Sequence, residues 1–102
     1  MRTLLFALLL STSLYSQEKA VVHINAEFNE SNNWYGLKAL TGVRVFNGYI
    51  EQSPAIKEKY SITKVPTVIL FVDGKEVQRW EAALDMKVHA TTKEIQNKID
   101  SY

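Results

Sequence analysis

Residues 59–80 read KYSITKVPTVILFVDGKEVQRW, and this stretch restricts the fold more than any other. Residues 62–72 end in a continuous apolar run, which is typical of a β-strand covered on both faces. Asp73 and Gly74 are a two-residue hairpin signal, and residues 76–80 alternate well enough to form the antiparallel return strand. The sequence therefore predicts a β-hairpin whose first strand is buried and is entered through Pro66.

Upstream of the hairpin, the pattern predicts two further strands and two short helices. Residues 20–28 (AVVHINAEF) begin β-branched and apolar and then alternate, which favours a mostly buried strand. Residues 29–33 (NESNN) favour a turn or a helix start. We expect a short helix over residues 33–40, a second strand over residues 43–50, and a short amphipathic helix whose first position is Pro54.

Downstream of the hairpin, the sequence predicts a C-terminal amphipathic helix. Thr91 and Glu94 have the spacing of a capping box, and Ile95, Ile99 and Tyr102 follow on one helical face. The predicted order is strand, helix, strand, helix, strand, strand, helix. Such an order indicates an α/β domain with a mixed four-stranded sheet flanked by helices.

The hairpin and the helix before it resemble a thioredoxin. A KYxIxxVPTxxLFxDGxxVxRW pattern carries the resemblance, matched by Lys59, Tyr60, Ile62, Val65, Pro66, Thr67, Leu70, Phe71, Asp73, Gly74, Val77, Arg79 and Trp80. The resemblance extends more weakly back to Val21 and forward to the last helix, without a counterpart of the family's opening strand and helix. It implies a minimal thioredoxin-like fold over residues 17–102.

The resemblance also implies a special backbone at Pro66. In thioredoxins the corresponding proline follows a cis peptide bond beside the redox site, and the backbone of the preceding residue pairs with an extended substrate segment. We therefore expect the Val65–Pro66 bond to be cis. The alternative is a trans proline that starts the strand, where the missing N–H is harmless.

At the place of the family's CxxC motif, the resemblance puts Asn29 and Asn32, with Glu30 and Ser31 between them. His23 stands where the family has a buried carboxylate. The chain contains no cysteine at all. Since thiol-disulfide exchange needs an attacking thiolate, the sequence excludes that activity.

Other roles for these polar residues remain open in the sequence. Asn29 and Asn32 are expected to cap the following helix, with a direct ligand role as the alternative. His23, Glu30 and Ser31 could supply an imidazole, a base and a hydroxyl, but nothing in the pattern brings them together. His23 is expected to be a core or half-buried residue, and His89 is expected in a solvated loop. Neither has carboxylate partners at metal-ligand spacing, so we predict no metal site and no cofactor.

Charge and the N-terminal segment bear on partners and compartment. Twelve basic and eleven acidic side chains give the 102 residues a formal net charge of +1 without a block of like charge, so nucleic acid is not an expected partner.

Residues 1–16 have the layout of a signal peptide, with Arg2, an apolar run from Leu4 to Leu10, and cleavage after Ser16. That run is too short to span a bilayer. We expect an exported product, periplasmic or secreted.

The residues around the lost motif and the proline predict a binding groove. Its expected members are Phe28, Asn29, Glu30, Ser31, Asn32, Trp34, Lys64, Val65 and Pro66. A non-catalytic module that holds a protein or an extended peptide by strand addition is the function we expect. The alternatives are an enzyme or a binder of a glutathione-like ligand that uses non-cysteine residues, and an assembly subunit with contacts elsewhere. The sequence leaves the oligomeric state open.

Overall fold

The computed structural model describes residues 17–102, so the predicted signal peptide lies outside the described residues. The elements are four strands, two 3-10 helices and two α-helices. In chain order they are β1 (Lys19–Asn25), η1 (Glu27–Asn32), η2 (Tyr35–Ala39), β2 (Arg44–Tyr49), α2 (Ala55–Lys59), β3 (Thr67–Val72), β4 (Lys75–Glu81) and α3 (Thr92–Asp100).

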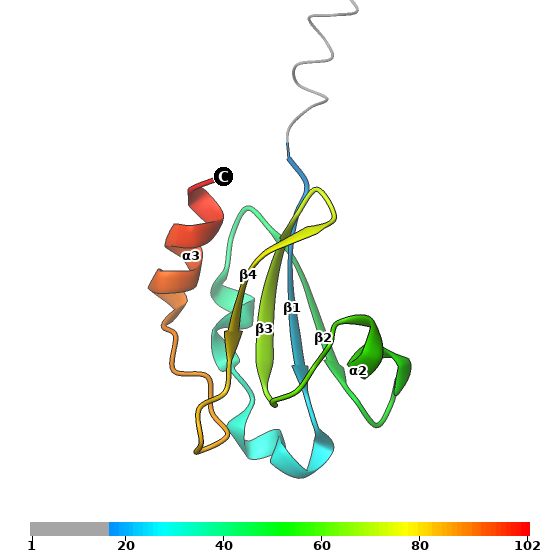
Figure 1. Ribbon diagram of the computed structural model, residues 1–102. Coiled ribbons are helices and arrows are strands. Elements are labelled where there is room, and N and C mark those ends of the chain that lie inside the picture. The colour runs from blue at the N-terminus through cyan, green and yellow to red at the C-terminus, as the bar shows by residue number, and fades with distance from the viewer. Residues whose placement is uncertain (1–16) are drawn as a thin grey trace, which may run out of the picture.

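The four strands form one mixed sheet, as the sequence predicts, and their order in it is β2-β1-β3-β4. β1 pairs in parallel with β2 and antiparallel with β3, and β3 pairs antiparallel with β4. The predicted hairpin is present: Asp73 and Gly74 join β3 to β4, both at positive φ, which is the backbone that such a turn requires. Figure 1 shows α3 and α2 on opposite sides of this sheet.

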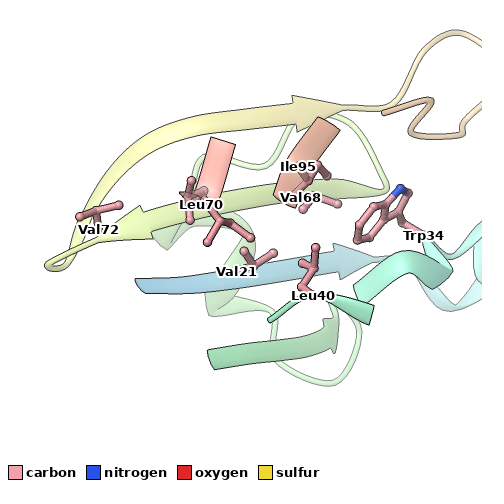
Figure 2. Close-up of a cluster of buried hydrophobic side chains, with 8 residues drawn as sticks. Val21, Trp34, Leu40, Val68, Leu70, Val72 and Ile95 are labelled. Atoms are coloured by element: carbon pink, nitrogen blue, oxygen red, sulfur yellow. The ribbon is translucent and has the colours of Figure 1, made fainter. Parts of the chain in front are cut away.

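On the α3 side, the sheet buries the larger of two apolar clusters. Its fully buried members on the strands and helix are Val21, Val68, Leu70, Ile95 and Ile99. Figure 2 shows Val72 at one end of this cluster and Trp34 at the other. Thr91 starts α3 as expected, because its hydroxyl oxygen accepts the backbone N–H of Glu94 at 3.0 Å.

On the α2 side, the cover is much thinner. Ile24, Ile62 and Ile69 are the buried residues, and partly buried side chains such as Ile56 and Tyr60 pack against them. α2 has only five residues. At about 1.5 Å per residue it is far too short to run the length of a strand, so part of this face of the sheet stays open.

Several boundaries differ from the sequence-based expectation, among them the start of α2, where Pro54 is the N-cap and Ala55 the first helical residue. β1 ends at Asn25, and residues 27–32 form η1, because the loop folds into a 3-10 turn in place of a continued strand. The expected short helix before the second strand is the 3-10 helix η2, one turn long, although Trp34 and Leu40 beside it are buried as its apolar face implies. Within residues 17–102, no helix combines the length and apolarity that crossing a membrane would require.

Candidate functional site

The Val65–Pro66 peptide bond is cis, which confirms the prediction. Local hydrogen bonds hold the turn: the Thr67 hydroxyl donates to the Lys64 carbonyl at 2.6 Å, and the Ala82 N–H donates to the Pro66 carbonyl at 3.1 Å. The proline therefore lies between β3 and the segment that follows β4. Figure 1 places this turn, η1 and the loop after β4 at the same end of the sheet.

Asn29 is the centre of this end of the molecule. Its side chain is only 4% exposed, and its amide nitrogen lies 3.3 Å from the Val65 carbonyl, 3.1 Å from the Met86 carbonyl and 3.2 Å from the Asn25 side-chain oxygen. The amide thus joins three segments that are far apart in the sequence. Met86 adopts a positive φ of 62°, so this contact also helps to hold a backbone that L-residues rarely adopt.

The other asparagines extend the network. Asn25 is fully buried and donates to the Asn29 carbonyl at 2.9 Å and to the Asn33 side-chain oxygen at 2.6 Å. The Asn32 amide donates to the Asn29 side-chain oxygen at 2.7 Å, and the Asn33 amide donates to the Tyr49 hydroxyl at 2.8 Å. Every buried side-chain nitrogen and oxygen of residues 17–102 has a partner.

His23 is a core residue, 2% exposed, as predicted. Its Nε2 accepts the backbone N–H of Trp34 at 3.0 Å, so the ring proton must be on Nδ1, which donates to the Asn47 side-chain oxygen at 2.7 Å. Burial lowers the pKa of His23 below its ordinary value of 6.5, although the hydrogen bond to Asn47 acts in the opposite direction. The neutral ring therefore links β1, β2 and the start of η2.

Trp34 lies in the core, which corrects its place in the predicted groove. It is 9% exposed, and its indole N–H donates to the Ala90 carbonyl at 2.9 Å. The ring packs so closely over Gly36 that a Cβ there would come within 2.7 Å of it. Trp34 donates to the segment before α3 and packs in the larger apolar cluster instead of facing a ligand.

An apolar groove does lie beside the cis proline. Its volume is about 550 Å³, and its walls are Thr63, Lys64, Val65, Ala82, Ala83, Leu84 and Met86. Leu84 is fully exposed. Sequence patterns did not predict the wall formed by residues 82–86. The available signal was a run in which apolar and polar residues alternate from Leu84 to Ala90, between the hairpin and the capping box.

Comparisons with known proteins agree on one fold. No family model matches the chain. Thioredoxin from Chlamydia trachomatis is 48% identical over 40 residues, and thioredoxin from Chlamydia caviae is 53% identical over 30 residues. These matches span 39% and 29% of this chain and the same shares of the relatives, so the aligned part is less than half of each curated relative.

Solved structures extend the similarity over nearly the whole chain. A single-residue mutant of thioredoxin from Halobacterium salinarum has a TM-score of 0.64 at 17% identity, covering 91% of this chain and 81% of that one. Thioredoxin-2, described as a component of malaria parasite protein secretion machinery, scores 0.63 at 13% identity and covers 84% of each chain. The chain has a thioredoxin-like fold. Thioredoxin NaTrxh from Nicotiana alata, with a TM-score of 0.58 at 20% identity, covers 97% of this chain and 85% of its own.

In the structure, Asn29 and Asn32 do not have the helix-capping role that the sequence predicts. The residues at the N-caps of η1 and η2 are Ala26 and Trp34, so the prediction that Asn29 and Asn32 cap a helix is wrong. The Asn29 side chain can donate and accept hydrogen bonds at once, and it points inward, where it meets two backbone carbonyls and the Asn25 amide. Asn29, which the resemblance aligns with the first cysteine of the CxxC motif, is a buried residue whose hydrogen bonds hold three segments together.

The remaining predicted groove residues are divided between surface and interior. Phe28, Glu30, Ser31 and Lys64 are exposed, Phe28 at 73%, whereas Val65 is half-buried and Pro66 is buried. Asn29 and Val65 do meet, as the alignment with thioredoxins implies, through the contact to the Val65 carbonyl. His23 has both ring nitrogens engaged, so the structure gives the imidazole a structural role.

Metal ligation has no support in the described part of the chain. Within residues 17–102, no three His, Cys, Asp or Glu side chains gather in a way that could hold an ion. His89 is exposed, as expected, but it has a carboxylate partner that the sequence pattern did not indicate: its Nε2 lies 2.7 Å from Asp85. The pair lies at the surface of the loop after β4.

Proposed function

We propose that this chain is an exported thioredoxin-like domain that binds a protein or an extended peptide without catalysing a reaction on it. The observation that carries the proposal is the apolar groove beside the cis proline, bordered by the fully exposed Leu84. A concave surface lined mainly by apolar side chains is the usual form of a binding site. The absence of cysteine accounts for the non-catalytic part of the proposal.

The geometry narrows how a ligand would bind there. The Val65 carbonyl accepts from Asn29, so part of the backbone beside Pro66 is already engaged. Strand addition at that residue would have to share or displace this contact. We therefore expect affinity to come mainly from apolar side chains that enter the groove between Val65 and Leu84, with fewer backbone hydrogen bonds than strand addition usually provides.

The binding test is a titration of the isotopically labelled protein with extended peptides that carry alternating apolar side chains. We expect amide shifts at residues 63–65 and 82–86, and for Leu84→Ser an affinity lower by about tenfold, because a large apolar contact contributes about 1.5 kcal/mol or more. Tyr102→Ser, an exposed aromatic at the end of the chain, is the matched control. Equal affinity for both variants and the wild type would exclude the groove.

Export is tested separately, by producing the full chain in a bacterial host and measuring its N-terminus and its location. We expect a processed form that begins at Gln17 and is recovered outside the cytoplasm. An uncleaved cytoplasmic product would refute this part of the proposal and leave the groove hypothesis standing.

A further inference from the structure

β2 is an edge strand of the sheet, and no strand within residues 17–102 pairs with its outer backbone. The Ile50 N–H donates to the Asn25 carbonyl at 3.0 Å, so even-numbered residues of this strand direct their backbone groups toward β1. Because these directions alternate along a strand, Val45 and Asn47 direct their N–H and C=O groups outward. They form a short template for another strand.

Both faces of β2 also carry exposed apolar side chains. Val45 is 40% exposed and Phe46 is 46% exposed, and successive side chains point to opposite faces of a sheet. On the α2 side, Phe46 borders a groove of about 620 Å³. Its apolar walls include Val22, Ile24, Phe46, Ile56, Tyr60 and Phe71. This is the part of the sheet that the five-residue α2 leaves open.

The opposite edge of the sheet is different. β4 carries Lys75, Glu76, Arg79 and Glu81, and the β3–β4 ladder is irregular between Leu70 and Phe71. Charges and bulges are the usual features by which natural edge strands avoid pairing with other chains. β2 has no proline, and its single charged residue is Arg44 at its first position. The β4 edge thus carries features that oppose pairing with another strand, and the β2 edge lacks them.

We propose that β2 is a dimer interface, at which two copies of this chain pair antiparallel about a two-fold axis that passes midway between the Phe46 residues of the two copies. A two-fold axis perpendicular to the sheet places residues of the same face opposite each other. With Phe46 opposite Phe46 of the second copy, Val45 lies opposite Asn47, and these two residues exchange backbone hydrogen bonds. The two Phe46 rings occupy the closer, non-hydrogen-bonded position, where side-chain contact is greatest.

Charge favours a second copy as the occupant of this edge. The Arg44 guanidinium lies 5.3 Å from the centre of its own Phe46 ring. In the proposed register Arg44 is opposite Gly48, so like charges do not meet, and the second Phe46 ring is a diagonal neighbour of the same guanidinium. A partner with another sequence would have to supply these features, whereas a second copy has them already.

The oligomeric state of the full chain tests the proposal, with its N-terminus read by mass spectrometry. We expect a monomer–dimer equilibrium in sedimentation. Val45→Pro removes an outward N–H and leaves the ladder to β1 intact, so it should raise the dissociation constant by about tenfold or more. Val45→Thr keeps that N–H and should still dimerise. Circular dichroism checks that both variants fold.

Cross-linking tests the register, because the chain has no cysteine of its own. Phe46→Cys places two thiols directly opposite each other and should form a disulfide-linked dimer under mild oxidation, whereas Val45→Cys, opposite Asn47, should not. The proposal is overturned if the wild type stays monomeric at all concentrations. That result overturns it whichever reason applies, retention of residues 1–16 or a different protein that covers the edge. Equal dimerisation of Val45→Pro and Val45→Thr would overturn it too.

Discussion

The loop around Asn29 and the edge strand β2 differ in burial in the opposite sense from what their compositions suggest. The loop is rich in asparagine, yet its amides turn inward and saturate one another and the neighbouring carbonyls. β2 carries valine and phenylalanine, yet both are substantially exposed. Buried polar residues hold together the loop that the resemblance aligns with the CxxC motif, whereas exposed apolar residues lie on the edge strand. Composition alone does not tell which part of this fold is available to a partner.

The largest expected effect is at the closed loop. Asn29→Ala should lower the free energy of unfolding by about 3 kcal/mol, because it leaves the Val65 and Met86 carbonyls and the Asn25 amide oxygen without their donor. Urea titration measures the change. Asn32→Ala, which removes one contact from a less buried side chain, is the control and should cost well under half as much. Similar losses for both would show that the network is not centred on Asn29.

Arg79 provides the next largest test, on the open side of the sheet. Its guanidinium donates to the Tyr60 carbonyl at 2.8 Å and to the Ser61 carbonyl at 3.3 Å, and it pairs with Glu76. Arg79→Ala should cost about 1–2 kcal/mol. Amide hydrogen exchange should quicken at residues 55–62, where α2 would detach, and stay unchanged at the Asn29 loop. Equally faster hydrogen exchange at residues 55–62 and at the Asn29 loop would show that the two regions do not open independently.

A third test uses the acid sensitivity of the closed end. Because burial lowers the pKa of His23, the unfolded chain takes up the proton first, and stability is lost as pH falls below about 6.5. One proton limits the slope to about 1.4 kcal/mol per pH unit. Thermal unfolding between pH 7.5 and 5.5 measures it. A His23→Gln variant that retains the dependence would assign the titration to another group.

The smallest effect is expected at the open strand. Phe46→Ser should change the free energy of unfolding by less than about 1 kcal/mol, because the ring is already half-exposed. Measured at a concentration where the protein is monomeric, a loss comparable to that of Asn29→Ala would mean that the groove beneath Phe46 belongs to the core. The contrast between the loop and the strand would then disappear.

The sequence predicts the framework well because a few residues impose it locally. Pro66 and the Asp73–Gly74 turn define the hairpin, and the apolar run before the turn makes β3 a central strand. The orientation of Asn29 was not predictable in the same way. A short amide side chain can bond to its own backbone or to distant carbonyls, and the distant partners at Val65 and Met86 exist only after the chain has folded.

Trp34 and Leu84 show the same limit from the apolar side. Large aromatic residues are mostly buried, but a position next to a turn favoured a surface role for Trp34, and only the contact with Ala90 shows that the ring is covered. Apolar and polar residues alternate from Leu84 to Ala90, yet no strand forms there, so the exposure of Leu84 beside the proline follows from the path of residues 82–86 rather than from the local pattern. Irregular segments are placed by tertiary contacts.

The Lys19 ammonium donates to the carbonyls of Ile99 and Tyr102, at 2.8 and 3.0 Å, and so fastens the start of β1 to the end of α3. Figure 1 shows this junction at the far end of the sheet from η1. A tether attached to residue 17 or to residue 102 would therefore hold the domain at the end of the sheet opposite η1. The groove beside Pro66 would then lie at the end far from the attachment. Mechanical load applied between residues 19 and 102 would act first on that junction before it reached the sheet.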